Sequence, residues 1–104
     1  INKIAELCKE NDIELVLVTA PIANVSMDYI TDYNSVHDKM AEIAENIDAK
    51  YIDFNIINSE EDLLKLENFR DDAHLNDSGV KIVDKYFVDW LVNNTEAFGK
   101  NNVM

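Results

Sequence analysis

An aspartate and a histidine three positions apart carry the clearest chemical signal in this sequence. Asp71 and His74 lie in the polar stretch Asn68–Gly79, which reads NFRDDAHLNDSG. A neutral imidazole accepts a proton near pH 7, because its unperturbed pKa is about 6.5. A carboxylate bonded to the other ring nitrogen fixes the tautomer and stabilises the imidazolium. Since one tight turn can join the two groups, the spacing predicts an acid–base pair that activates a hydroxyl nucleophile.

The pair follows segments whose hydrophobic spacing predicts alternating helices and strands. Apolar residues three and four positions apart indicate helices that bury one face, and short aliphatic runs indicate strands. A polar loop from Glu67 to Asp77 then carries the pair, and residues 22–33 are expected to form an irregular loop. Helices are expected over residues 1–10, 36–47, 59–66 and 78–93, and strands over residues 13–19 and 50–54.

The first helix and the first strand also predict which side chains are buried. Ile1, Ile4, Ala5 and Cys8 share one face of the helix, and we expect that face to be buried. The run IELVLVT from Ile13 to Thr19 is typical of a parallel strand that is buried on both faces.

Polar residues mark the expected starts of the later helices. Asn34 or Ser35 is expected to cap the second helix, and Asn76 or Asp77 the last one. The run Ser59–Asp62 resembles a capping box, which predicts that the third helix begins there.

The resulting order, α-β-α-β-α-α, predicts an α/β layered fold with a parallel sheet. Residues 1–93 are expected to form part of one α/β domain, and residues 94–104 a polar, frayed tail. Two strands are too few for a stable open sheet. We therefore expect either further strands in an N-terminal half that is missing here, or pairing with another copy. The chain begins at Ile1 rather than at Met, which favours a piece of a longer protein.

Charge and composition exclude several classes of function. The formal net charge of −12 disfavours nucleic acid and anionic membrane surfaces as partners. Cys8 is the one cysteine, so it forms no internal disulfide, and its place on an apolar helix face favours packing. A calcium loop starting at Asp72 would need Gly and Glu where the chain has Asp77 and Val83. No metal or cofactor is expected.

Each candidate residue also has a purely structural interpretation. His74 can be a loop histidine that caps the helix or packs on Leu75, and Asp71 and Asp72 can be solvated acids. Asp77 fits a helix cap better than a ligand. Two further groups are expected to be structural: His37 as a surface residue of an amphipathic helix, and Tyr86, Phe87 and Trp90 as packing rather than a sugar platform.

The polar stretch resembles a known motif. Asp71-x-x-His74 followed by Leu75-Asn76-x-x-Gly79 is similar to the last motif block of SGNH/GDSL hydrolases. The expected strand before it and helix after it lie where that family has them, so the likeness covers roughly residues 13–91. The resemblance implies a three-layer, flavodoxin-like parallel sheet, of which this chain would be the C-terminal portion.

By this resemblance, Asp71 would orient the base, His74 would be the general base, and Gly79 would let the final helix begin close to the site. The family's Gly-Asp-Ser turn, which carries the nucleophile, has no counterpart here, nor do the Gly and Asn of its oxyanion hole. The serines of this chain lie in the wrong context for the nucleophile; they are Ser26, Ser35, Ser59 and Ser78.

The resemblance implies a serine ester hydrolase or acyltransferase whose nucleophile lies outside this chain, so that the chain alone would be inactive. Implied substrates are acyl esters, often acetyl, of carbohydrates, cell-wall polymers or lipids, and bacterial relatives of this style are often anchored at the cell envelope. The alternative is a non-catalytic SGNH-like module for interaction or assembly. Self-association of the chain is a third possibility.

Overall fold

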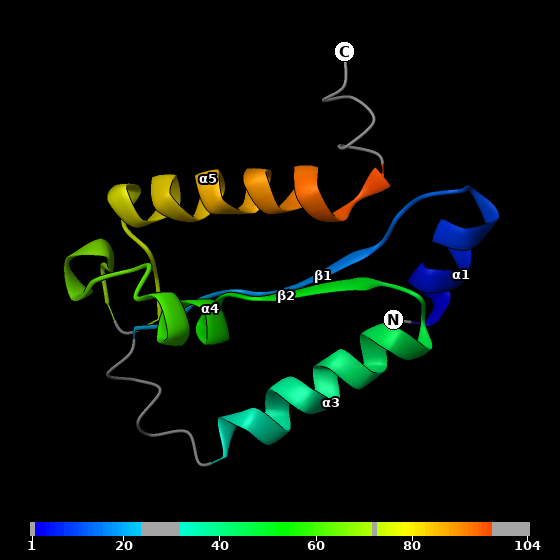
Figure 1. Ribbon diagram of the computed structural model, residues 1–104, viewed down its shortest axis with the longest axis horizontal. Coiled ribbons are helices and arrows are strands. Elements are labelled where there is room, and N and C mark those ends of the chain that lie inside the picture. The colour runs from blue at the N-terminus through cyan, green and yellow to red at the C-terminus, as the bar shows by residue number, and fades with distance from the viewer. Residues whose placement is uncertain (1, 24–31, 72, 97–104) are drawn as a thin grey trace. The chain divides into compact units, whose positions relative to one another are not determined.

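The computed structural model describes residues 2–23, 32–71 and 73–96 (Figure 1). Among these residues β1 and β2 form a two-stranded parallel sheet, and helices alternate with the strands. The expected α/β alternation is therefore present. The elements in chain order are α1 (Asn2–Glu10), β1 (Val16–Thr19), α3 (Tyr33–Asn46), β2 (Lys50–Asp53), α4 (Phe54–Glu61), the 3-10 helix η1 (Leu66–Asn68) and α5 (Asp77–Asn94).

The chain divides into two compact units. The first comprises Ile1–Val18 and Asp32–Ile52, and the second comprises Thr19–Thr31 and Asp53–Met104. Both strands thus lie almost wholly in the first unit, and their last residues belong to the second unit. Asp71 and His74 are also in the second unit.

In the first unit, α1 and α3 end in the same way. Asp12 and Asp48 follow the two helices in the left-handed conformation, with φ of 56° and 58°. Behind each of them the chain folds back onto its helix, as in a Schellman motif. The matching backbone bonds run from the Ile13 N–H to the Cys8 carbonyl and from the Ala49 N–H to the Ala44 carbonyl, both at 2.8 Å.

Burial in the first unit differs from the expectation at several positions. Ala5 is buried and Cys8 is half-buried, but Ile4, expected on the same face, is 55% exposed. Ile13 precedes β1 and is exposed, and Val18 within β1 is 48% exposed. The prediction of a strand buried on both faces is therefore wrong for the described residues, because such burial needs other elements packed on both faces and Val18 is left uncovered. Ile1 lies outside the described residues.

In the second unit, α4 begins directly after the last residue of β2. Asp53 caps this helix: its carboxylate accepts the Asn55 N–H at 2.9 Å and the Ile56 N–H at 3.4 Å. The prediction that a helix starts at Ser59–Asp62 is wrong, because these residues end α4 and Asp62 takes the left-handed conformation behind it. The cap lies where the strand ends, so no loop separates the two elements.

Buried amides hold the chain around α4. Asn55 accepts the Ile22 N–H at 2.9 Å and donates to the Ala20 carbonyl at 3.3 Å, which ties the segment after β1 to the start of α4. Asn58 is 1% exposed and accepts the Leu64 N–H at 2.6 Å. Since Leu64 is itself buried, that bond fixes the turn that follows the helix.

An aromatic cluster packs α5 against α4. Phe54 is 1% exposed, and its ring packs in T-shaped arrangements with the rings of Tyr86 and Phe87, at centroid distances of 6.0 and 6.1 Å. Trp90 stacks on Phe87 at 6.2 Å. The Tyr86 hydroxyl donates to Glu61 at 2.8 Å, and this carboxylate raises the pKa of Tyr86. The expected packing role of these aromatics is what the structure shows.

The remaining helix boundaries follow the sequence closely. α5 runs from Asp77 to Asn94, and Asn76 caps it, as predicted. α3 starts at Tyr33, with Asp32 at the capping position, so neither Asn34 nor Ser35 is the cap. Residues 24–31 of the expected irregular loop and residues 97–104 of the expected tail lie outside the described residues. In the described part of the chain, no helix combines the length and apolarity needed to cross a membrane.

Replacing Asp12 or Asp48 by glycine should stabilise the protein. Glycine adopts the left-handed conformation without a steric penalty, and an acidic side chain is unfavourable at a helix C-terminus. We expect each substitution to raise the free energy of unfolding by up to about 1 kcal/mol in urea titrations. Asp38→Gly, within α3, is the control and should lower it by about 0.5–1 kcal/mol. A loss of stability in Asp12→Gly and Asp48→Gly alike would contradict the described turns.

Candidate active site

The candidate pair lies on a loop that is closed at its base by the backbone. The Asn76 N–H donates to the Asn68 carbonyl at 2.9 Å. Further along the loop, Phe69 and Leu75 form an antiparallel bridge, and the Arg70 N–H donates to the His74 carbonyl at 2.8 Å. These bonds bring the two arms of the loop together just before Asp71, in the segment that leads from η1 to α5 (Figure 1).

The structure brings Asp71 and His74 together. Nδ1 of His74 lies 2.8 Å from Oδ1 of Asp71 and 3.1 Å from Oδ2. The side chain of His74 is 64% exposed and that of Asp71 is 58% exposed, so the imidazole lies at the surface and not in the core. The spacing in the sequence therefore predicted a real contact.

The Asp71 carboxylate is also held by its own loop. The Ala73 N–H donates to Oδ1 of Asp71 at 2.9 Å. This backbone bond, together with the bond to His74, lowers the pKa of Asp71 from its usual value of 3.8. Both bonds favour the ionised form, so Asp71 is a carboxylate at neutral pH.

An ionised Asp71 determines the tautomer of His74. A carboxylate can only accept a hydrogen bond, so Nδ1 of the neutral imidazole must carry the proton and donate it. Nε2 then holds the lone pair. Within residues 2–23, 32–71 and 73–96, no group hydrogen-bonds Nε2 of His74. The exposed ring nitrogen is thus a free proton acceptor, which is what a general base requires.

The start of α5 closes tightly on the base of the loop. Oδ1 of Asn76 accepts the Gly79 N–H at 3.0 Å, which caps the helix. A Cβ at Gly79 would collide with the Asn68 carbonyl oxygen and lie 2.7 Å from Cδ2 of Leu75. The absence of a side chain at Gly79 therefore lets the last helix begin against the loop that carries the pair.

Other candidate residues lie elsewhere. Asp77 is the first residue of α5 rather than its cap, and Asp72 lies outside the described residues. His37 is half-buried, with its ring 5.5 Å from the ring of Tyr51, so it is more enclosed than expected for a surface residue. Sequence reasoning missed Asn68, which is 6% exposed; its position just before the motif was the one available signal.

The described serines do not complete a triad with His74. The Ser35 hydroxyl donates to Asp32 at 2.5 Å, and the Ser78 hydroxyl donates to Asn76 at 2.6 Å. Neither of these hydroxyls bonds the imidazole, and neither does Ser59, which lies in α4. Ser26 lies outside the described residues. Over the described ranges there is also no group of three or more His, Cys, Asp or Glu that could hold a metal ion.

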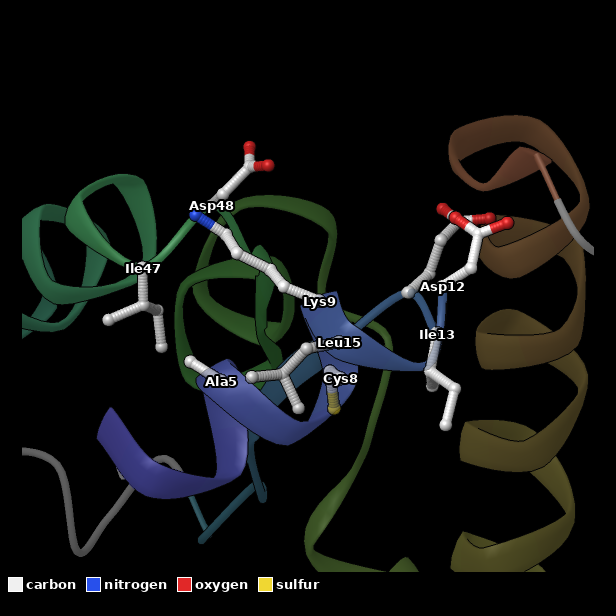
Figure 2. Close-up of a pocket in the computed structure, with 9 residues that line it drawn as sticks. Ala5, Cys8, Lys9, Asp12, Ile13, Leu15, Ile47 and Asp48 are labelled. Carbon is white, nitrogen blue, oxygen red and sulfur yellow. The ribbon is translucent and has the colours of Figure 1, made fainter.

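A hollow of about 300 Å³ lies in the first unit, where α1 and α3 end (Figure 2). Cys8 lines it, and in Figure 2 the Lys9 side chain extends toward Asp48. The lining contains a thiol but no imidazole, so it offers no histidine-activated nucleophile. The remaining lining residues are Ala5, Asp12, Ile13, Glu14, Leu15 and Ile47.

Gly79→Ala should destabilise the protein, although alanine favours helices more than glycine does. The added methyl group must displace the Asn68 carbonyl or the Leu75 side chain. We expect a net loss of about 1–3 kcal/mol in the free energy of unfolding, typical of overpacking. Lys81→Ala, two residues later and exposed on the same helix, is the control and should change the free energy of unfolding by less than about 0.5 kcal/mol. Equal stability of Gly79→Ala and the wild type would show that the helix starts farther from the loop.

His74→Ala should raise the pKa of Asp71 without fully restoring its usual value. The imidazole bond is lost, but the Ala73 N–H bond, which lowers the pKa most, remains. A carbon-13 NMR titration of the carboxyl group measures this shift, with His37→Ala as the control that leaves it unchanged. A pKa of Asp71 that is the same with and without the His74 ring would contradict the pairing.

The lowered pKa of Asp71 also determines the pH range in which its carboxylate stabilises the folded protein. Because the pKa of Asp71 is lowered in the folded protein, its contribution is complete above the unfolded-state value of about 3.8 and is lost as the pH falls through the folded value. His74→Ala should therefore reduce the dependence of stability on pH below about pH 4.

Comparisons with known proteins find no relative of this chain: no protein-family model, no curated protein and no solved structure matches it. The resemblance of the Asp71–Gly79 block to one hydrolase family therefore rests on the residues of that block alone. What the geometry adds is one contact, the bond between the carboxylate of Asp71 and the imidazole of His74.

Proposed function

We propose that this chain supplies the acid–base part of a serine ester hydrolase or acyltransferase. Asp71 orients and stabilises the base, and His74 is the general base. The observation that carries the proposal is the 2.8 Å contact between His74 Nδ1 and Asp71 Oδ1. It leaves Nε2 of this largely exposed side chain without a hydrogen bond to any residue that the structure describes. The nucleophilic serine and the oxyanion donors come from residues outside this sequence, in a larger three-layer sheet of the SGNH type.

The chemistry then follows from the two ring nitrogens. As the serine hydroxyl attacks the ester carbonyl, Nε2 of His74 takes its proton, and the imidazolium is stabilised by Asp71 across Nδ1. The same proton passes to the departing alkoxide when the tetrahedral intermediate collapses, which leaves an acyl-enzyme. Water or an acceptor alcohol repeats the two steps, so that the acyl group is hydrolysed or transferred. Asp71 stays ionised throughout.

The exposure of the pair supports this division of labour. A base that serves a nucleophile from another segment must present Nε2 at a surface, and the His74 side chain is 64% exposed. Asp71 by contrast needs no contact with the substrate, because it acts through the imidazole. The substrates that we propose are acyl esters of carbohydrates, cell-wall polymers or lipids, and the net charge of −12 favours those without clustered negative charge.

A second candidate function is a non-catalytic module of the same fold that supports binding or assembly. It is favoured by the missing Gly-Asp-Ser turn and by the scarcity of glycine, since the chain holds Gly79 and Gly99 alone. Each of the two units also exposes apolar side chains that a partner or a second copy could cover. They are Ile4, Leu7, Ile13, Val18, Val36, Leu66, Val80 and Val88.

Loss of the imidazole should abolish most of the activity of the natural protein from which this sequence comes. We expect His74→Ala to lower kcat/KM for an activated acetyl ester by about 10²- to 10⁴-fold, because the base is removed. Asp71→Asn should lower it as well, since an amide can stabilise the wrong tautomer. His37→Ala is the matched control and should keep wild-type kinetics.

A serine-reactive phosphonate distinguishes the two candidate functions. The enzyme should be labelled at one serine in the natural protein, and labelling should slow strongly in His74→Ala. Folded natural protein that hydrolyses no ester and takes up no phosphonate would be the module instead. Wild-type kcat/KM in His74→Ala would remove His74 from the mechanism.

A further inference from the structure

We propose that Asn68 is a positioning residue for the Asp71–His74 pair and acts through Ser78 and Asn76. Its effect on catalysis rests on the proposed function, whereas its effect on the geometry of the pair does not. The Asn68 side chain is buried at the base of the loop, and it bonds neither member of the pair. It therefore acts through the loop rather than on the substrate.

The amide of Asn68 makes two different hydrogen bonds. Oδ1 accepts the Lys65 N–H at 2.8 Å, and Nδ2 donates to Oγ of Ser78 at 3.0 Å. The first bond joins Asn68 to the residue before η1, and the second joins it to the first turn of α5. A residue at this position must accept and donate at once, which an amide does and a carboxylate at neutral pH does not.

The Ser78 hydroxyl links the side chain of Asn68 to that of Asn76. Its hydroxyl accepts from Asn68 and donates to Oδ1 of Asn76 at 2.6 Å. The Asn76 amide then donates to the Glu67 carbonyl at 2.7 Å, which returns to the segment that holds Asn68. These bonds form a closed ring that joins the two ends of the loop, so each member holds the others in place.

The ring lies directly below the backbone bonds that shape the site. The Asn76 N–H bonds the Asn68 carbonyl, and the Arg70 N–H bonds the His74 carbonyl. Because these two hydrogen bonds hold the arms of the loop together, the His74 ring lies close enough to bond the Asp71 carboxylate. If the base opens, the two arms are free to separate, and the bond between carboxylate and imidazole lengthens or is shared with water.

Three variants and one control test the proposal, and all are measured in the 104-residue chain. Asn68→Asp keeps the acceptor for Lys65 and removes the donor to Ser78. Ser78→Ala removes the hydroxyl that joins Asn68 to Asn76, and Ser78→Thr restores it. Asn93→Asp is the control, because Asn93 is an exposed amide on α5 that bonds within its own helix.

The readout is the carboxyl titration of Asp71, together with amide hydrogen exchange at Arg70 and Asn76. We expect Asn68→Asp and Ser78→Ala to shift the titration of Asp71 upward, toward its usual value, and to speed exchange at both amides. Ser78→Thr and Asn93→Asp should match the wild type. If Asn68→Asp does not fold, Ser78→Ala and Ser78→Thr alone decide. Folded variants with unchanged titration and exchange would overturn the proposal.

Kinetics of the natural protein separate this proposal from the proposed function. A pair loosened by about an ångström should lower kcat/KM by roughly 10- to 100-fold in Ser78→Ala, with recovery in Ser78→Thr. If the natural protein hydrolyses no ester while the titration still shifts, the proposed function fails and the positioning role stands. If the enzyme is active and Ser78→Ala keeps both its kinetics and its titration, the positioning role fails alone.

Discussion

One hydrogen bond underlies the functional interpretation of this protein: the contact between Nδ1 of His74 and the carboxylate of Asp71. It determines the tautomer of the ring and leaves Nε2 as the free acceptor. The contact is exposed on both sides, so its attraction is screened by water and its own contribution to stability is small. Its geometry must therefore come from the loop around it, in which backbone bonds and the buried amide of Asn68, rather than the pair itself, hold the two groups together.

Local patterns in the sequence were enough to predict the pair and the helix that follows it. A carboxylate three positions before an imidazole predicted their contact, and Asn76 predicted the start of α5. The order of helices and strands was also predictable, because each element has its own hydrophobic period. The resemblance to a known motif, rather than a local pattern, implied that Gly79 lets the last helix begin close to the loop, and the Asn68 carbonyl is the group that it approaches.

Tertiary context decided the features that the sequence did not predict. Ser59–Asp62 has the composition of a helix start, yet Asp53 caps the helix earlier because β2 ends there. Nothing in the sequence distinguishes Asn68 from an ordinary loop residue, because its hydrogen bonds to Lys65 and Ser78 depend on the folded loop. Ile4 has the spacing of a buried residue but is exposed, since periodicity shows which residues share a face and not what covers that face.

The direct test of this account is the tautomer of His74, read from the nitrogen-15 chemical shifts of its ring in the 104-residue chain. At a pH where the ring is neutral, the account predicts a ring protonated on Nδ1, with that proton shared with Asp71 and Nε2 bare. A neutral ring that carries its proton mainly on Nε2 would mean that the carboxylate does not hold the imidazole. The assignment of His74 as an oriented base would then be contradicted.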